Sequence, residues 1–346
     1  MPFYYELKNG MEATAQGLIR LRAQLSREIP LRTLQDSLLL ATWNIREFDS
    51  PKYGERDQEC FYYIAEIISR FDLVAIQEVR EDLEALERLK RILGSQWKHL
   101  VTDITFGTAG NGERMAYLYD ERKVRFDGLA GEVVLPPDKQ QAVRQFARTP
   151  YIASFRAGWV RFNLCTAHIY YGEAVADEPT RLAEIRDLAT LLAEKTRATW
   201  GTRRPENLAI LGDFNIFSPT DATYQAIVDA GFIIPEALQS VGGSNVDQSK
   251  YYDQIAFLGH EKRFVFTGRA GVLDFYESMY RLEDEPSFAP RIGSTYNEAV
   301  TPHKKTLAYK QWRTFQMSDH LPMWIELKID FAEDYLARCA GGAVPT

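Results

Sequence analysis

The chain has 346 residues, of which 45% are hydrophobic and 26% are charged, so it has ample material for one large packed domain or two ordinary ones. It contains no run of about 18 apolar residues, which excludes a membrane-spanning helix. The formal net charge of −7 argues against a protein whose whole surface binds nucleic acid, but it leaves room for a local basic groove.

The chain begins with a predicted helix. Apolar residues recur at helical spacing over about residues 12–29, at Leu18, Leu21, Leu25 and Ile29. We interpret residues 1–36 as an N-terminal helical extension. Two interpretations of it stay open: a helix packed on the outside of the domain, or a helix that binds a partner such as a protein regulator.

Apolar strands and helical patterns then alternate along the chain. We expect strands at 38–44, 73–76, 114–119, 208–211, 251–257 and 322–329, and a hairpin formed by 151–155 and 160–166. We expect helices at about 57–70, 81–93, 178–197, shortly after Pro219, and near 271–281. The segments 106–112, 136–150 and 283–317 are predicted to be irregular.

Several neighbouring strands are joined by connections too short for a helical crossover, so those strands must pair antiparallel. Mixed sheets flanked by helices follow from this pattern. No repeat or linker interrupts residues 38–329. We therefore predict one catalytic domain over residues 37–330, followed by a C-terminal tail, 331–346.

Cysteine usage bears on the compartment. Cys60, Cys165 and Cys339 are an odd number, widely spaced and without a C-x-x-C motif, which favours a reducing environment over a disulfide framework. The first six residues lack the basic and apolar regions of a secretory signal. We predict a cytoplasmic protein, with secretion of a processed form left open.

Polar side chains sit at the ends of the predicted strands. They are Asn44, Glu78, His168, Asp213 with Asn215, Asp253, and Asp319 with His320. Buried without partners, such groups would cost several kcal/mol apiece. A hard divalent cation bound by oxygen ligands resolves that cost. The chemistry implied is attack of water on a phosphodiester, with Mg²⁺ neutralising charge on the phosphate and imidazoles moving protons.

The strand-end motifs carry a family resemblance. They are Thr42-Trp43-Asn44, Ile76-Gln77-Glu78-Val79-Arg80, Gly212-Asp213-Phe214-Asn215, Tyr252-Asp253-Gln254-Ile255 and Ser318-Asp319-His320-Leu321-Pro322. In this order the chain resembles the endonuclease/exonuclease/phosphatase superfamily, and within it the pancreatic-type deoxyribonucleases. The resemblance implies an α+β fold: a four-layer α/β/β/α sandwich of two mixed, mainly antiparallel sheets flanked by helices.

The resemblance also assigns roles to particular residues. Asn44, Glu78 and Asp319 resemble the surroundings of the first metal ion, Mg²⁺ or its substitute Mn²⁺. His168 and His320 resemble the catalytic imidazole pair, which Glu113 and Asp253 orient, respectively. Asp213 and Asn215 would position the water, the phosphate or a second metal. Whether one metal or two are used stays open.

Substrate contacts are predicted from the same resemblance and from local composition. Arg80 and Arg148 match arginines that contact the nucleic-acid backbone, and Arg114 adjoins Glu113. Asn111 stands where the family has a stacking tyrosine, which puts engagement of a minor groove in doubt. Lys304, Lys305 and Arg313 are interleaved with aromatic residues before His320. That segment is interpreted either as a nucleic-acid groove or as a solvated loop that its aromatic residues anchor to the core.

Three functions are compared. The leading interpretation is a metal-dependent endonuclease acting on DNA. The alternative is a phosphoesterase that acts on an inositol lipid or another small phosphate ester. A binding or scaffold protein that has lost catalysis is disfavoured, because the set of candidate ligands and both histidines are complete.

Overall fold

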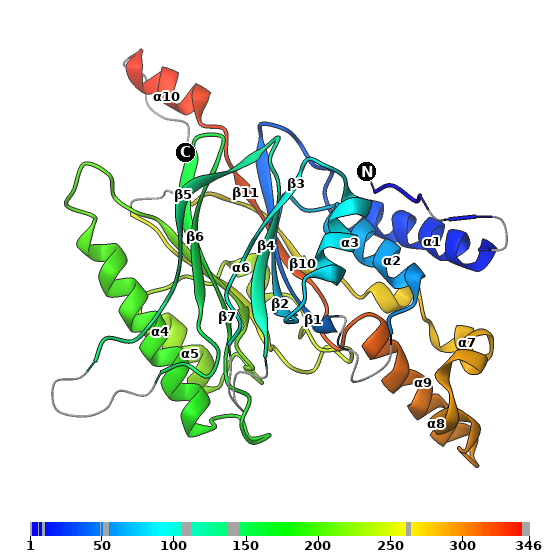
Figure 1. The fold of residues 1–346 in the computed structure, drawn as a ribbon. Coiled ribbons are helices and arrows are strands. Elements are labelled where there is room, and N and C mark those ends of the chain that lie inside the picture. The colour runs from blue at the N-terminus through cyan, green and yellow to red at the C-terminus, as the bar shows by residue number, and fades with distance from the viewer. Residues whose placement is uncertain are drawn as a thin grey trace.

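Two β-sheets packed face to face form the centre of the molecule, and helices cover their outer faces (Figure 1). The computed structural model describes residues 2–5, 7–8, 11–48, 50, 55–105, 112–137, 145–260 and 264–340. The six-stranded sheet has the order β10-β11-β1-β2-β4-β3, and the five-stranded sheet has the order β5-β6-β7-β8-β9.

The strands of the six-stranded sheet are β1 Ser37–Phe48, β2 Leu73–Val79, β3 Trp97–Val101, β4 Arg114–Asp120, β10 Phe266–Val272 and β11 Met323–Lys328. Those of the five-stranded sheet are β5 Val124–Glu132, β6 Tyr151–Ala157, β7 Val160–His168, β8 Leu208–Asp213 and β9 Asp253–Leu258. The pairs β1/β2 and β7/β8 are parallel, and the other neighbouring pairs are antiparallel. The predicted sandwich of two mixed, mainly antiparallel sheets is confirmed.

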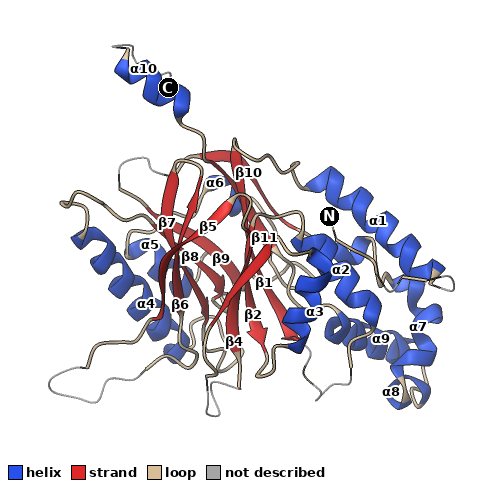
Figure 2. Ribbon diagram, turned by 45° about the horizontal axis from the view of Figure 1, so that its top comes forward, coloured by secondary structure: helices blue, strands red, loops and turns tan. Residues whose placement is uncertain are grey.

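The helices lie in two outer layers (Figure 2). On the side of the six-stranded sheet are α1 Glu12–Glu28, α2 Gln58–Ile68, α3 Glu84–Leu93, α7 Glu285–Ile292, α8 Ser294–Asn297 and α9 Pro302–Gln316. On the side of the five-stranded sheet are α4 Pro179–Ala198 and α5 Ala222–Asp229; α6 Glu236–Gln239 is a short helix, and α10 Ala332–Cys339 ends the described chain. In the parts of the chain given above, no helix combines the length and apolar character needed to cross a bilayer.

Alternation along β1 shows how one strand serves two cores. Leu38 and Leu40 belong to the apolar cluster between the sheets, whereas Leu39 and Ala41 belong to the cluster under the outer helices. Successive strand side chains point to opposite faces, so a near-continuous apolar run is needed where both faces are covered. For this reason the apolar run of β1 predicts a buried strand.

Buried polar contacts fix the two sheets to each other. The Tyr117 hydroxyl on β4 donates to the carbonyl oxygens of Tyr151 and Leu164, at 2.7 Å each as alternative acceptors, and accepts from the backbone N–H of Thr166 at 2.8 Å. Gln77 Nε2 donates to Thr166 Oγ1 at 2.8 Å. Gln77 directly precedes Glu78, so the sheets are locked together at the edge where the candidate site lies.

The N-terminal helix α1 packs on the outside of the domain, which was one of its two interpretations. Leu18, Leu21 and Leu25 of α1 are buried in the outer core against α2. These apolar side chains are therefore used within the fold and are not offered to a partner. The division of the chain into extension, catalytic domain and tail stays a prediction.

Two local predictions were wrong. The segment 283–317 contains α7, α8 and α9 instead of an irregular loop. Its prolines suggested breaks, but Pro302 occupies the first turn of α9, where a missing N–H costs nothing, and Thr301 caps the helix by accepting from the Lys304 N–H. The helix expected near 271–281 is instead the end of β10 and one short 3₁₀ turn, Phe275–Glu277, because the bulged, glycine-containing edge strand hides its period.

Candidate active site

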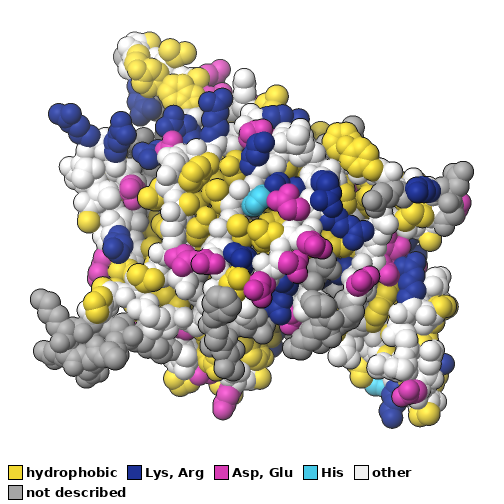
Figure 3. All heavy atoms as spheres, in the orientation of Figure 1, with side chains coloured by type: hydrophobic (Ala, Val, Ile, Leu, Met, Phe, Trp, Pro, Cys, Tyr) yellow, Lys and Arg dark blue, Asp and Glu magenta, His cyan; other side chains and the backbone are white. Residues whose placement is uncertain are grey.

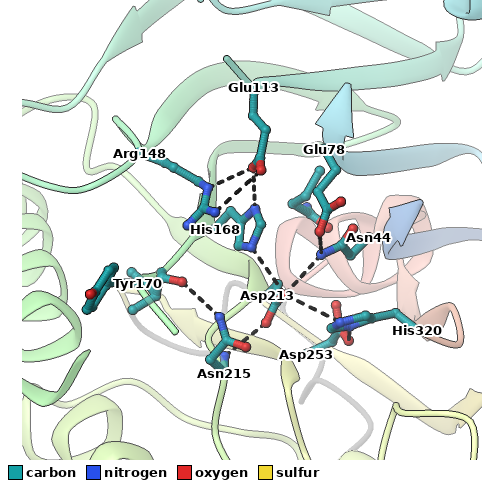
Figure 4. Close-up of polar contacts among 12 residues, drawn as sticks. Asn44, Glu78, Glu113, Arg148, His168, Tyr170, Asp213, Asn215, Asp253 and His320 are labelled. Carbon is teal, nitrogen blue, oxygen red and sulfur yellow. Dashed lines mark hydrogen bonds and ion pairs between the residues drawn. The ribbon is translucent and has the colours of Figure 1, made fainter. Parts of the chain in front are cut away.

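Strand ends from both sheets meet at one edge of the sandwich, and the predicted polar residues gather there (Figure 4). The parallel pairs β1/β2 and β7/β8 deliver their C-terminal ends to this edge, whereas β9 and β11 begin at it because they run antiparallel to β8 and β1. Register then places three residues in a row across neighbouring strands: His168 opposite Asp213, and Asp213 opposite Asp253.

His168 lies against a carboxylate that two arginines also approach. Its Nδ1 is 2.9 Å from Glu113 Oε2, although the ring N–H is not aligned well enough on that oxygen to form a hydrogen bond. Arg148 Nε donates to the same Oε2 at 2.7 Å, and Arg80 comes within 3.9 Å of Glu113 Oε1. Glu113 is buried. The arginines therefore favour the ionised form of a carboxylate that would otherwise be costly to bury.

His320 has its own carboxylate, and Asp213 lies between the two imidazoles. His320 Nδ1 is hydrogen-bonded to Asp253 Oδ2 at 2.8 Å. Asp213 Oδ2 is 3.5 Å from His168 Nε2 and 3.6 Å from His320 Nε2. Burial alone would lower the pKa of His320, but the carboxylates of Asp213 and Asp253, with Asp319, raise it well above its ordinary value. These neighbouring carboxylates therefore favour the protonated form of the imidazole.

The segment that carries His320 is tied to β1. Ser318 Oγ donates to the Asn44 carbonyl oxygen at 2.6 Å and accepts from the His320 N–H at 3.0 Å. The indole N–H of Trp43 donates to the His320 carbonyl oxygen at 2.9 Å. Buried hydrogen bonds thus hold the segment before β11 against β1.

Asn44 and Glu78 form the part of the site that suits a cation. Asn44 Nδ2 donates to Glu78 Oε1 at 2.9 Å and to Asp213 Oδ2 at 3.0 Å, so the amide cannot be flipped without setting its oxygen against two carboxylates. Its Oδ1 is buried without a hydrogen-bond partner in the described structure. Burial and the charges of Glu113 and Asp319 raise the pKa of Glu78, although His168 and a hydrogen bond from the Glu47 N–H act in the opposite direction.

A divalent cation fits these residues. It would satisfy the Asn44 oxygen and offset the repulsion around Glu78. Within the described ranges, no three His, Cys, Asp or Glu side chains converge as a metal site by themselves. A cation here would draw on the amide oxygen of Asn44 beside the carboxylates. Asp319 lies toward solvent, 42% exposed, with its Oδ2 3.5 Å from Arg46 Nε.

The sequence profile of the Endonuclease/Exonuclease/phosphatase family matches residues 41–231, more than half of the chain. The chain belongs to this family. It is accordingly a hydrolase of phosphoester bonds in a family of metal-dependent phosphoesterases.

Two curated relatives are named as deoxyribonucleases. One, from Thioalkalivibrio sp. (strain K90mix), is 28% identical over 71% of this chain, and the chain spans 64% of its length. The other, deoxyribonuclease-1 of Rattus norvegicus, is 23% identical over 80% of this chain and 95% of its own length.

Two solved structures share the fold. A family protein from Bacteroides thetaiotaomicron has a TM-score of 0.52 and 18% identity, with 86% of this chain and 97% of that chain covered. The catalytic domain of human Nocturnin has a TM-score of 0.52 and 13% identity, with 84% and 94% covered. At these identities the likeness establishes the fold alone.

Asn215, the candidate for contact with the phosphate, is held in a backbone turn. It has a φ of +53°, its N–H donates to Asp213 Oδ1 at 2.9 Å, and its Nδ2 donates to the Ile169 carbonyl oxygen at 2.8 Å. Asparagine tolerates the left-handed region better than most residues. Asp213 and Asn215 are thus held together in one turn.

The predicted substrate arginines occupy different settings. Arg80 is also paired with Glu47 at 2.7 Å, and both Arg80 and Arg148 keep a little solvent exposure beside Glu113. Arg114 donates to the carbonyl oxygen of Thr102 at 2.7 Å, so the backbone already engages it. Asn111 lies outside the described residues.

The basic segment before His320 is a helix, and its members diverge. Arg313 is buried and donates to the Tyr280 carbonyl oxygen at 2.9 Å, which does not support its predicted contact with substrate. Lys304 and Lys305 lie in the first turn of α9, about 18 Å along the helix from Gln316 at the end nearer the site. The arrangement favours the anchoring interpretation for the aromatic residues of this segment.

Sequence reasoning missed an aromatic wall beside His320. The Tyr252 ring lies 5.4 Å from the His320 ring and 5.7 Å from Phe217, and Tyr171 lies 6.2 Å from Phe217. Buried Arg181 stacks on Phe217 at 4.7 Å and donates to the Tyr171 carbonyl oxygen at 2.7 Å. Tyr171 and Phe217 follow His168 and Asn215 within three positions, and Tyr252 directly precedes Asp253; this closeness to the site motifs is the signal in the sequence that pointed to them.

Proposed function

We propose that this protein is an endonuclease that hydrolyses DNA phosphodiesters with Mg²⁺ as its metal ion. One observation carries the proposal: two imidazoles, each beside a buried carboxylate, converge on Asp213 next to the unpartnered Asn44 oxygen. Phosphodiester hydrolysis needs a positioned water, proton transfer and charge stabilisation, and this set supplies groups for each.

Asn44 and Glu78, with Asp319, would hold the cation. When bound, the metal would neutralise charge on the phosphate. Asp213 is placed to orient the attacking water and accept its hydrogen bond, because it lies between both imidazoles. The protonated form of His320, which its neighbouring carboxylates favour, would stabilise negative charge on the phosphoryl oxygens. His168, beside Glu113, is the second proton-handling group.

Two observations favour DNA over small phosphate esters as the proposed substrate. Arg80 and Arg148 stand beside the site, where phosphates flanking the scissile bond would pass. The two curated relatives above are both named as deoxyribonucleases. The cytoplasmic location and the use of Mg²⁺ rather than Mn²⁺ stay predictions.

Supercoiled plasmid incubated with the protein and Mg²⁺ tests the proposal. We expect nicking that chelator abolishes and that His320→Ala reduces by about 10²-fold or more. His303→Ala, which removes an exposed histidine, is the matched control and should nick like the parent. Intact plasmid together with release of phosphate from an inositol lipid would instead establish the alternative phosphoesterase.

A further inference from the structure

A second site candidate lies at the end of the sandwich opposite the strand ends that carry the candidate active site. A cavity of about 960 Å³ opens between the β6–β7 hairpin, the segment before β8, and α10. In Figure 1, α10 lies at the top of the molecule, whereas β1 and β2 end at the bottom. At the hairpin turn, the backbone N–H of Trp159 donates to the Ile329 carbonyl oxygen at 3.0 Å. This bond fixes the cavity wall to the chain that leads into α10.

The cavity is rich in arginine although the chain is acidic overall. Its lining includes five arginines and only two carboxylates, Glu206 and Asp334. The arginines are Arg156, Arg161, Arg203, Arg204 and Arg338. Figure 3 shows Lys and Arg side chains gathered around the base of α10.

Few of these charges are neutralised within the fold. Arg156 and Arg161 share one carboxylate, Asp127. Of the two carboxylates of the lining, Glu206 accepts from the amide of Asn163, also in the lining, and Asp334 accepts from Lys328. Among the described residues, no carboxylate lies within ion-pair distance of Arg203, Arg204 or Arg338. The cavity therefore has an excess of positive charge with donors available to an anion.

Large exposed aromatic surfaces stand beside these arginines. Trp159 is 55% exposed and Tyr335 is 49% exposed, with their ring centroids 5.6 Å apart. Buried Val160 and Phe162 contribute to the lining between them and the core. Exposing an indole and a phenol next to guanidinium groups is costly for a surface that only meets water, whereas planar bases stack on such rings.

We infer that this cavity binds a segment of single-stranded nucleic acid, with phosphates on the arginines and bases on Trp159 and Tyr335. Arginine suits this role because its planar fork pairs with phosphate and stacks on rings. An acidic peptide would use the charge but would leave the aromatic faces without planar partners. The volume suits a short segment of strand, not a duplex. The inference is drawn from the cavity alone and does not require the proposed nuclease activity.

Binding of a short fluorescein-labelled single-stranded oligodeoxynucleotide, measured by anisotropy in chelator, tests the inference without turnover. We expect Arg203→Glu/Arg204→Glu to weaken binding by about tenfold or more at low salt. The control is Arg91→Glu/Arg186→Glu, which makes the same charge change at two exposed arginines outside the cavity. We expect Trp159→Leu to weaken binding by about tenfold and to remove part of the tryptophan quenching that the strand causes.

Equal weakening in the cavity variant and the control would overturn the inference, as would an acidic peptide of matched charge that binds as tightly as the strand. Hydrolysis of a small phosphodiester should be unchanged in the cavity variants. Plasmid nicking without cavity-dependent binding would remove this inference and leave the proposed function. Cavity-dependent binding without nicking would remove the proposed function and leave this inference.

Discussion

Substitution of Gly212 by alanine should damage both stability and catalysis, for a reason that the strand register makes explicit. Gly212 has a φ of +134° and pairs with Ala167 in the parallel ladder between β7 and β8. A Cβ at this position would lie 2.0 Å from the Ala167 carbonyl oxygen and 2.9 Å from its nitrogen. Neither atom is the end of a flexible side chain, so the strands themselves must separate.

The expected loss of stability has two parts. Forcing an L-residue into a left-handed conformation costs roughly 1–2 kcal/mol. Overpacking against a fixed backbone costs about 1–3 kcal/mol more. The sum, about 2–5 kcal/mol, is a large share of the roughly 5–15 kcal/mol by which a folded domain is stable.

The expected loss of activity comes from the next pair in the ladder. His168 and Asp213 directly follow Ala167 and Gly212, and His168 Nε2 lies 3.5 Å from Asp213 Oδ2. Relieving the clash must widen the ladder by about 1 Å, and misplacement on this scale costs on the order of 10²-fold in rate. We expect kcat to fall by at least this factor.

Urea denaturation and hydrolysis of a small chromogenic phosphodiester measure the two effects separately. Gly131→Ala is the matched control, because a Cβ there meets nothing within 4 Å and the backbone needs no left-handed conformation. Its free energy of unfolding should stay within about 0.5 kcal/mol of the parent. If Gly212→Ala behaved like Gly131→Ala in both assays, the reasoning from the ladder would be refuted.

Three further predictions use other parts of the structure. Asn44→Leu should abolish the thermal stabilisation that excess Mg²⁺ gives the parent, about 2.7 kcal/mol at a hundredfold excess over Kd, as scanning calorimetry would show; stabilisation equal to the parent's would contradict the ligand assignment. Asp253→Asn removes a carboxylate that raises the pKa of His320, so the alkaline limb of kcat/KM should move to lower pH, and an unmoved limb would argue that the imidazolium is not required. Burial alone would raise the pKa of Asp120, but hydrogen bonds from Arg122 and Arg32 lower it to about 2, so its ionised form contributes about 2 kcal/mol above pH ~4 that is lost as the pH falls toward 2. Urea denaturation should therefore show Asp120→Asn destabilised at pH ~7 but close to the parent at pH ~2; an equal loss at both values would contradict this linkage.

The sequence predicted the strands that are buried on both faces, because their apolar runs end in polar residues. That is how β1, β2, β7 and β8 were found together with Asn44, Glu78, His168 and Asp213. Edge strands were found less well: β3, β5 and β10 were missed. The exposed face of β5 carries charged and small residues, so its composition resembles that of a loop.

In the helical layer over the six-stranded sheet, helices were predicted to be irregular segments. Proline and glycine in 283–317 were interpreted as interruptions, whereas Pro302 begins α9. Arg313 looked like one of several surface cations by composition. It is buried because its guanidinium lies 4.1 Å from the Tyr276 ring and donates to a backbone carbonyl, contacts that depend on how α9 packs. No property of the local sequence separates it from Lys304.

The contacts within the site could not be predicted from sequence either, since they depend on register. Asp213 could be named as a strand-end carboxylate, but its position between two imidazoles follows from the pairing of β7, β8 and β9, in which His168, Asp213 and Asp253 fall in one row. A slip of one residue would turn Asp213 to the other face of the sheet.

The residues proposed for catalysis lie on the paired strands, whereas those proposed to contact the substrate lie beyond the strand ends. The row of His168, Asp213 and Asp253 is set by hydrogen bonds between strands, so no change in a loop alone can rearrange it. Arg80 and the aromatic residues Tyr171, Phe217 and Tyr252 lie just beyond the strand ends. Under the proposed function, substrate preference can therefore vary in these flanking residues while the row of His168, Asp213 and Asp253 stays in place.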